Sequence, residues 1–321
     1  MGAFASILWL HSAVELYPVS AGLQAGDNPR MIAIVVHGGA GRWDETERDG
    51  AVAGVRCAAA AGWQVLESGG GALDAVTAAV IALEDDPLFN AGTGSVLNAE
   101  GDAELDAGIM AGDTLAAGGV ACVRRVRNPV LVARRVMEAT DCVLLAGAEA
   151  VRFARDQGFA DYDPVTGRRR ARWRAARARQ AGERLVPGTV GAVALDGNGR
   201  LAAATSTGGR ELKRPGRVGD SPVPGAGNYA TAQAAVSATG WGEFMLRMAA
   251  AKTIATRIES GESPQSAAAA VLEDMERIFG APIGVICLDA RGAVGIVHGT
   301  EGMPHAWRSG GDDDFKARFA T

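Results

Sequence analysis

Apolar and polar positions divide residues 31–157 into predicted strands and helices. The run MIAIVVHGG from Met31 is β-branched and ends at glycines, which is typical of a fully buried strand. In 46–68 and 72–84 the pattern is helical, and in the second segment aliphatic residues recur on one face. The segments ELDAGIM and GGVACVR are predicted to be two further strands.

The pattern then changes from ordered elements to a basic segment. Helices are predicted at 129–139 and 142–157. The next segment, 158–188, has no apolar periodicity and carries seven arginines and no acid between Arg168 and Arg179. We therefore expect a flexible, solvated linker there.

The last third of the chain begins with a strong hairpin signal. Two alternating apolar runs, TVGAVAL and RLAAATST, flank the turn DGNG at 196–199. A second hairpin is predicted in IGVICLD-ARG-AVGIVHG, and helices are predicted at about 243–260 and 263–278. This order favours an α+β fold, with helices covering sheets in layers, over a doubly wound βαβ series.

Composition limits the possible chemistry. The chain has 321 residues, of which 48% are hydrophobic and 21% charged, as in a globular protein with a large core. The net charge of −5 leaves no general electrostatic footprint for nucleic acid. The four cysteines and four histidines are widely scattered, so neither a zinc site nor a Cys-His dyad is supported.

The first thirty residues are apolar but do not form a convincing signal. The run AFASILWL has no Lys or Arg before it and is broken afterwards by His11 and Glu15. We expect residues 1–30 to be a disordered extension or an overcalled translation start. The expected compartment is the cytoplasm, with the periplasm as the alternative if this segment is an export signal.

One peptide bond stands out as a source of catalytic chemistry. At Gly188-Thr189 the basic segment meets a buried-type strand that begins with Thr. If this bond were cut, Thr189 would gain a free amine beside its own hydroxyl, and one residue would supply both base and nucleophile. The alternative interpretation is that Gly-Thr only starts a strand.

Residues downstream of this junction favour the catalytic interpretation. The hairpin brings Thr207, at the end of its second strand, beside the start of its first strand. Arg217 offers a planar fork for a carboxylate, and Asp220 can meet an ammonium group. Gly240 and Gly242 allow the backbone to approach a substrate closely. Backbone N–H groups at a strand-to-helix turn can stabilise an oxyanion. Together these groups suit an amino-acid zwitterion.

Seven blocks at coherent spacing resemble one known family, the plant-type asparaginases and isoaspartyl peptidases, which are N-terminal-nucleophile hydrolases. The blocks are HGGAG at 37–41, PLFNAGTGS at 87–95, ELDAGIM at 104–110, GTVGAVALD at 188–196, TSTGG at 205–209, GRVGDSP at 216–222 and ATGWGE at 238–243. The resemblance covers residues 31 to about 308 in the correct order.

The resemblance implies a four-layer αββα sandwich made as a single precursor. Self-cleavage before the nucleophile would give an α chain, with its domain part at 31–188, and a β chain at 189–321. Both chains would belong to one domain, and two αβ units would form a dimer.

The same resemblance implies roles in the reaction itself. Thr189 would be the nucleophile at the cleavage site with Gly188, and Thr207 would orient it. Thr239 and the backbone of Gly240 would line the oxyanion hole.

Other matched positions would bind the substrate. Arg217 would hold the α-carboxylate, and Asp220 with the Gly242 carbonyl would hold the α-amine. Asn90 would lie near the nucleophile.

A cation site is implied as well, although catalysis itself would need no cofactor. In some members of the family, backbone carbonyls of the loop after the second helix bind a structural sodium ion, and an acidic, glycine-flanked loop suits a hard cation. The matching residues here are Leu83, Glu84, Asp86, Phe89, Ala91 and Thr93.

The predicted function is hydrolysis of β-aspartyl dipeptides and L-asparagine, with release of L-aspartate. One alternative is a glycosylasparaginase-like amidase. Another is an unprocessed, non-catalytic protein that binds partners through the Arg-rich segment. We expect no nucleic-acid or membrane partner. The stretch RELKRP at 210–215 is bulky and charged where the family has small polar residues, so the leaving group stays open.

Overall fold

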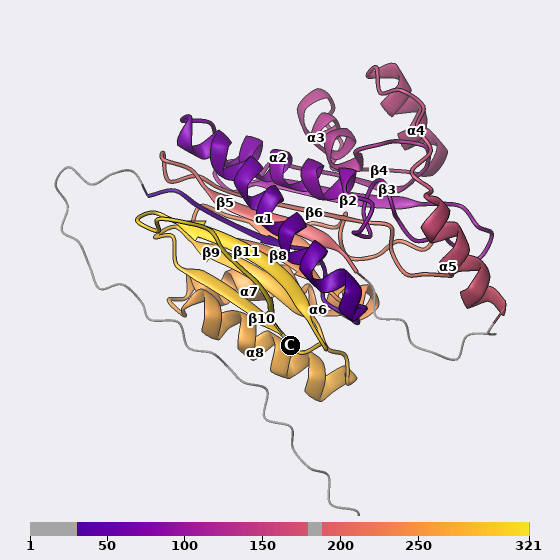
Figure 1. Ribbon diagram of the computed structural model, residues 1–321. Helices are drawn as coiled ribbons and strands as arrows, with labels where there is room; N and C mark the ends of the chain where they lie inside the picture. The colour runs from indigo at the N-terminus through magenta and orange to yellow at the C-terminus, as the bar shows by residue number, and fades with distance from the viewer. Residues whose placement is uncertain (1–30, 179–187, 321) are drawn as a thin grey trace, which may run out of the picture.

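The computed structural model describes residues 31–178 and 188–320. The predicted extension at 1–30 and residues 179–187 of the predicted linker lie outside the described residues, and the compartment stays a prediction. Within the described parts of the chain, no helix is long and apolar enough to cross a membrane. The fold is α+β, as predicted, and contains two sheets (Figure 1).

The larger sheet has eight strands in the order β12-β11-β1-β5-β6-β2-β3-β4. All neighbours in it are antiparallel except β3 and β4, which are parallel. Its strands are β1 (Ala33–His37), β2 (Leu105–Ala111), β3 (Ala117–Val123), β4 (Leu144–Ala146), β5 (Val190–Leu195), β6 (Leu201–Thr207), β11 (Met303–Ser309) and β12 (Lys316–Ala320).

The smaller sheet has four antiparallel strands in the order β10-β9-β8-β7. They are β7 (Asn228–Ala230), β8 (Ala234–Thr239), β9 (Gly284–Asp289) and β10 (Val294–His298). Both predicted hairpins are therefore confirmed, as β5–β6 and β9–β10. The two sheets contact each other through β1, β2, β5 and β6 of the larger sheet and β7, β8 and β9 of the smaller one.

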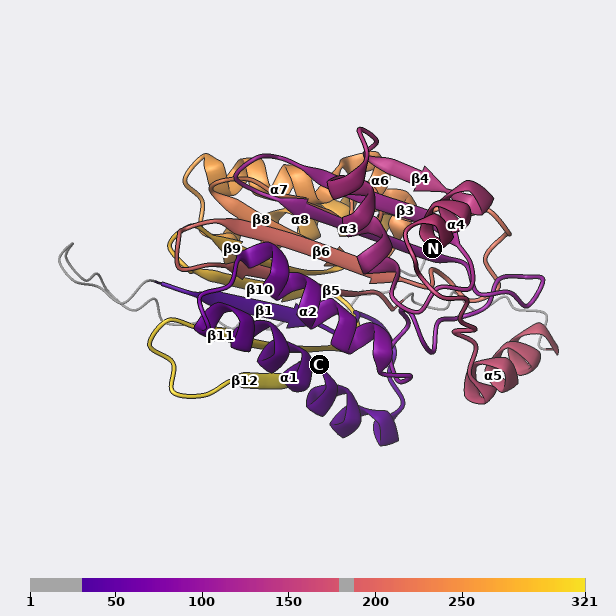
Figure 2. The same ribbon diagram turned by 90° about the horizontal axis from the view of Figure 1, so that it is seen from above.

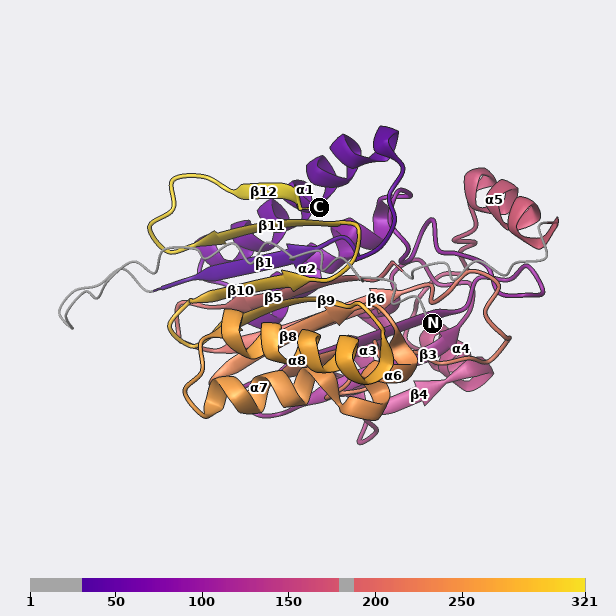
Figure 3. The same ribbon diagram turned by 90° about the horizontal axis from the view of Figure 1, so that it is seen from below.

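Helices cover the outer face of each sheet. Figure 2 shows α1, α2 and α3 over the larger sheet, and Figure 3 shows α7 and α8 over the smaller one. The helices are α1 (Glu45–Glu67), α2 (Ala72–Asp85), α3 (Pro129–Ala139), α4 (Gly147–Asp156), α5 (Gly167–Ala178), α6 (Gly242–Met248), α7 (Ala250–Glu259) and α8 (Pro264–Phe279).

Strand β1 shows why the first apolar run is continuous. Ile34 and Val36 pack in the cluster under α1 and α2, whereas Ala33 and Val35 pack in the cluster between the two sheets. All four are fully buried. A strand that is covered on both faces has no polar face, so it reads as an unbroken hydrophobic run.

Two predicted helices are interrupted. The segment predicted as one helix at 142–157 begins with the short strand β4, and helix α4 starts only at Gly147. The segment predicted at 243–260 is divided between α6 and α7 at Ala249, which adopts the left-handed conformation with φ 46°. A left-handed residue ends the first helix and changes the direction of the second.

The prediction of a flexible linker across 158–188 was wrong for the part that forms α5. Alanine and arginine are good helix formers, so the segment needs no conventional apolar stripe to become helical. The face that contacts the rest of the protein contains Arg169, Trp173 and Ala176, at spacings of four and three residues. Figure 3 shows α5 beyond the ends of the strands.

We predict that Gly62→Ala destabilises the fold. A Cβ on Gly62 would lie 2.8 Å from the Ala75 carbonyl oxygen of α2 and against Ile34 of β1. We expect a loss of about 1–3 kcal/mol of unfolding free energy, because the helix cannot move away from both neighbours. Thermal unfolding followed by circular dichroism measures it. The control is Gly167→Ala on α5, whose Cβ would have nothing within 4 Å; equal melting temperatures for the two variants would contradict the prediction.

Candidate active site

The open end of the β5–β6 hairpin carries two threonines. Thr189 immediately precedes β5 and is 4% exposed, and Thr207 is the last residue of β6. Antiparallel pairing sets Val190 opposite Ser206, so the two threonines meet where the hairpin opens. The Thr189 hydroxyl donates a hydrogen bond to the Thr207 hydroxyl, with 3.1 Å between the oxygens. Their predicted proximity is confirmed.

The carbonyl of Gly188 is held by two donors. Thr207 Oγ1 donates to it at 3.1 Å, and Asn90 Nδ2 donates to it at 2.6 Å. Asn90 Nδ2 also donates to the Gly209 carbonyl at 2.8 Å, and the Gly209 N–H donates to Thr207 Oγ1 at 2.9 Å. The peptide bond between Gly188 and Thr189 thus has a carbonyl oxygen that is polarised from two sides.

The loop after β1 connects this hairpin end to β8. Gly39 has φ +105°, and a Cβ there would lie 2.9 Å from the Thr189 nitrogen. The next residue, Ala40, donates its N–H to Thr239 Oγ1 at 3.3 Å. Thr239 is fully buried at the end of β8, and Gly240 follows it with φ +141°. These contacts place the Thr239–Gly240 turn on the loop that packs against Thr189.

A second group of predicted residues meets around Gly242. A Cβ on Gly242 would lie 2.7 Å from Asp220 Oδ1 and 2.8 Å from Arg217 Nη2. The absence of a side chain on Gly242 therefore leaves open the space where a carboxylate and a guanidinium face each other. A substrate ammonium and carboxylate could be bound in this arrangement.

Sequence reasoning gave no role to Glu243, which the structure places on the same guanidinium. Its carboxylate accepts from Arg217 Nε and Nη2, both at 3.0 Å, and from Arg210 Nη1 at 3.1 Å. The Arg210 guanidinium also lies over the Trp241 ring, 4.9 Å from its centroid. The sequence feature that could have indicated this role is the position of Glu243, directly after Gly242 in the first turn of a helix.

The pKa values of Asp220 and Glu243 are shifted in opposite directions. Burial raises the pKa of Asp220 to about 7, and among the described residues Asp220 Oδ2 has no hydrogen-bond partner. Burial also acts to raise the pKa of Glu243, but the hydrogen bonds and charge of Arg217 outweigh it and hold that pKa below its usual value. Glu243 is thus a fixed anion, whereas Asp220 is a buried acid that a cation would stabilise in its charged form.

Asp106 supports the loop that carries Arg217. It is fully buried, and its carboxylate accepts from the Cys122 N–H at 2.7 Å and the Gly219 N–H at 3.2 Å. One side chain therefore ties β3 to the loop between Arg217 and Asp220.

His37 is positioned as a structural residue, as its strand-end location suggests. It is fully buried, and Nε2 lies 3.0 Å from Ser237 Oγ, which in turn lies 2.7 Å from Thr205 Oγ1. Burial lowers the pKa of His37 to about 3, and the charge of His305 acts in the same direction. A ring with so low a pKa is a poor general base near neutral pH.

The six predicted sodium ligands lie at the C-terminus of α2 and in the turn that follows. The Leu83 carbonyl has no helical partner, because residue 87 is proline, and a helix C-terminus attracts cations. The Glu84 carbonyl accepts from Thr93 N–H, and the Phe89 carbonyl accepts from Arg169, and each carbonyl oxygen keeps a second lone pair. The donor set fits a hard cation, and sodium binding stays a prediction. Among the described side chains, no cluster of three or more His, Cys, Asp or Glu could hold a metal ion.

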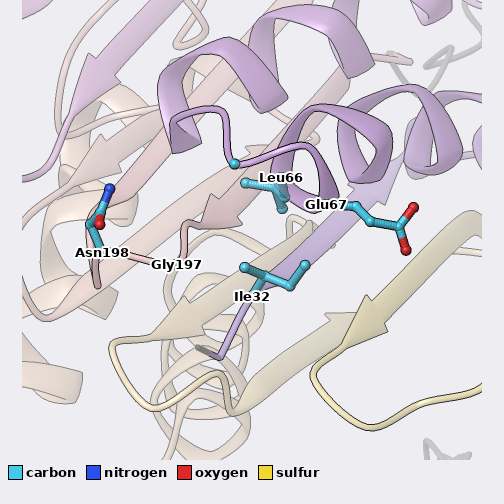
Figure 4. Close-up of a pocket in the computed structure, with 6 residues that line it drawn as sticks. Ile32, Leu66, Glu67, Gly197 and Asn198 are labelled. Carbon is cyan, nitrogen blue, oxygen red and sulfur yellow. The ribbon is translucent and has the colours of Figure 1, made fainter. Parts of the chain in front are cut away.

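A surface pocket exists at the other end of the hairpin (Figure 4). It is lined by Ile32, Leu66, Glu67, Gly69, Gly197 and Asn198. Because β5 runs from Val190 to Leu195, its turn lies at the far end from Thr189. Among the lining residues only Glu67 is ionisable, so the pocket offers no nucleophile and base pair.

A threonine hydroxyl beside a polarised carbonyl, and a guanidinium and a carboxylate that meet around Gly242, are compatible with a hydrolase. The asparaginase family model matches residues 30–315. The chain belongs to the asparaginase family.

Three curated relatives illustrate this similarity. The chain is 46% identical over 305 residues to the plant-type L-asparaginase of Pyrococcus abyssi, covering 89% of this chain and 99% of that protein. It is 45% identical over 266 residues to the isoaspartyl peptidase/L-asparaginase of Xenopus laevis, covering 81% and 86%. It is 43% identical over 299 residues to the isoaspartyl peptidase of Escherichia coli, covering 87% and 93%.

We predict that Asp106→Asn lowers stability. An asparagine offers one acceptor oxygen where two N–H groups, of Cys122 and Gly219, need acceptors. We expect a cost of about 1–3 kcal/mol, because one buried donor is left unpaired. Thermal unfolding of this variant should be compared with that of Asp113→Asn, which changes an exposed aspartate. An unchanged melting temperature for Asp106→Asn would show that the buried carboxylate does not hold this loop.

Proposed function

We propose that the protein is a self-processing amidohydrolase that cleaves β-aspartyl dipeptides and L-asparagine through Thr189. The observation that carries the proposal is the position of the Thr207 hydroxyl. It contacts the Thr189 hydroxyl and the Gly188 carbonyl at 3.1 Å each, so the nucleophile lies beside the bond to be cut. The names of the curated relatives support the same substrates.

Self-cleavage would begin inside the precursor. Thr189 Oγ attacks the Gly188 carbonyl carbon, and Asn90 and Thr207, which already donate to that carbonyl oxygen, stabilise the oxyanion. The bond from the Gly188 carbon to the Thr189 nitrogen breaks, the nitrogen takes up the proton that the attacking hydroxyl has released, and an ester between Gly188 and Thr189 Oγ remains. Water then hydrolyses the ester, which leaves a carboxylate on Gly188 and a free amine on Thr189.

The released amine would act as the general base in turnover. It accepts the proton of the Thr189 hydroxyl, whose oxygen attacks the side-chain carbonyl of the aspartyl substrate. Thr239 and the Gly240 backbone stabilise the oxyanion, and the proton passes to the departing amine or ammonia. Water then attacks the acyl-enzyme and releases L-aspartate, and Thr189 recovers its hydroxyl.

The clamp around Gly242 would hold the aspartyl half of the substrate. Glu243 uses Nε and one N–H of Nη2, so the remaining N–H groups of Arg217 can bind the α-carboxylate. Asp220, with its unpaired oxygen, and the Gly242 carbonyl would bind the α-ammonium. This pair orients the substrate by charge at two points.

The position of Arg210 favours dipeptides over asparagine as substrates, because this residue could bind the leaving group of a dipeptide. Arg210 belongs to the charged stretch 210–215, lies over Trp241 and shares Glu243 with Arg217. Its guanidinium can bind the C-terminal carboxylate of the leaving amino acid, which ammonia lacks. No contact of the described residues favours a glycan leaving group.

The non-catalytic alternative is less well supported by helix α5. Arg168 pairs with Glu47 at 2.7 Å, and Arg172 lies 3.5 Å from Asp44. Arg169 is buried, so three of its basic residues already have partners within the protein. A nucleic-acid surface would need these charges to be free.

Architecture, assembly and cation binding complete the proposal. The helix-covered outer faces and the apolar cluster between the sheets are consistent with a four-layer αββα sandwich. We propose that the chains 31–188 and 189–321 form one αβ unit, that two units dimerise, and that the loop after α2 binds a structural sodium ion. No cofactor is proposed for the reaction.

We predict that the purified protein consists of two fragments, the smaller of which begins with Thr189. Thr189→Ala should remain one chain and should not hydrolyse β-Asp-Leu or L-asparagine, because it lacks the hydroxyl that cuts the precursor. Gel electrophoresis, mass spectrometry and a substrate panel measure this. The control is Thr114→Ala, at an exposed threonine, which should mature normally. Full activity from an uncut chain would refute the proposed function.

We also predict an ionisation near pH 7 in kcat/KM. Burial raises the pKa of Asp220 to about 7, so below that pH the protonated acid cannot pair with a substrate ammonium. For L-asparagine kcat/KM should therefore rise through pH 7. Succinamic acid, which is L-asparagine without the α-amine, should keep only the ionisation of the Thr189 amine, at pH ~8. Identical profiles for the two substrates would contradict the assignment of Asp220.

A further inference from the structure

Helix α5 inserts one arginine into the loop that follows α2. Arg169 is 8% exposed, although it lies among exposed arginines of the same helix. Its Nη2 donates to the Leu88 carbonyl at 3.2 Å and to the Phe89 carbonyl at 3.1 Å, and its Nε donates to the Gly94 carbonyl. Burial lowers the pKa of Arg169 to about 10, so the guanidinium still carries its charge at neutral pH.

The carbonyls that Arg169 binds lie on both sides of Asn90. Leu88 and Phe89 immediately precede it, and Gly94 follows four residues later. Between these points the Asn90 carbonyl accepts from the Gly208 N–H at 2.9 Å. The guanidinium therefore joins the two ends of the loop 88–94. Asn90, within this loop, is hydrogen-bonded to Gly208, directly after β6.

The Asn90 side chain has to point in one direction to perform its role. Its Oδ1 accepts from the Val96 N–H at 2.9 Å, which turns Nδ2 toward the carbonyls of Gly188 and Gly209. A shift of the loop by a fraction of an ångström would change the 2.6 Å contact with Gly188. The position of this loop therefore determines how Asn90 aligns the peptide bond before Thr189.

The chemistry of arginine suits this task. Nε and Nη2 lie on one edge of a planar, rigid group, so one side chain can bind carbonyls on two arms of a loop at once. A lysine ammonium could bind these carbonyls only as a single point. Helix α5 is itself held in place by Trp173, whose Nε1 donates to the Asn98 carbonyl at 2.8 Å, and by the ion pair of Arg168 with Glu47.

We propose that Arg169 is a positioning residue for self-cleavage: its guanidinium joins the carbonyls of Leu88, Phe89 and Gly94 and thereby aligns Asn90 on the Gly188 carbonyl. This inference rests on the proposed function, because it assigns a role in the maturation of Thr189. It also gives the Arg-rich segment a function within the protein.

The experiment measures the rate of precursor cleavage in full-length protein for Arg169→Met, Arg169→Lys and Arg169→Ala. We expect Arg169→Met to cleave about ten- to a hundredfold more slowly than the unmodified chain, because displacement of a positioning group by about 1 Å has effects of that size. Arg169→Lys keeps the charge and should recover part of the rate. Arg170→Met, at an exposed arginine of the same helix, is the control and should cleave normally.

Chemical rescue separates positioning from simple packing. Millimolar guanidinium should accelerate cleavage of Arg169→Ala, whereas urea, which has a similar shape but no charge, should not. Cleavage of Arg169→Met at the normal rate, equal rates for the Met and Lys variants, or equal rescue by both solutes would overturn the proposal. Failure of Arg169→Met and Arg169→Lys to fold would also overturn it, because Arg169 would then be a residue of the core. If the unmodified chain itself never cleaved, the proposed function would fail instead.

Discussion

The antiparallel pairing of β5 with β6 is the constraint on which the rest of the site depends. A hairpin returns the chain to its starting point, so the residue before β5 and the last residue of β6 must lie together. In this protein those residues are Thr189 and Thr207, and the peptide bond before Thr189 is held at the same place. Thr189 and Thr207 are both buried at this junction, and burial strengthens the hydrogen bond between their hydroxyls.

Charged side chains complete the site. Each of them either has a hydrogen-bond partner within the protein or keeps hydrogen-bonding groups for a ligand. Arg217 is paired on one edge by Glu243, which leaves its other N–H groups for a ligand. Asp220 is fully enclosed, and its burial raises its pKa to about 7 although the charge of Arg217 acts to lower it. Arg169 is buried against carbonyls instead of a carboxylate. Such groups are costly to bury, so they indicate where the structure is adapted to bind a ligand or to hold a loop.

Most elements with a strong local pattern could be predicted from the sequence. The β5–β6 hairpin was found because a DGNG turn separates two apolar runs, and α3 was predicted with its observed bounds. Strand β8 was not predicted, because its sequence AAVSAT is made mainly of small residues that have no strand signal of their own. Helix α5 was missed because its buried face consists of an arginine, a tryptophan and an alanine. Tertiary packing, and not a local sequence pattern, stabilises β8 and α5.

The sequence by itself determined the elements that have a strong local pattern, the threonine at the glycine junction and the candidate residues Arg217 and Asp220, since local pattern and residue chemistry are enough for these. Only the tertiary structure decided that Glu243 occupies one edge of Arg217 and that Arg169 reaches the loop around Asn90. These contacts join residues far apart in the chain, 26 positions in the first case and 80 in the second. No local periodicity encodes such a pair, because its geometry exists only after the sheets and helices have packed.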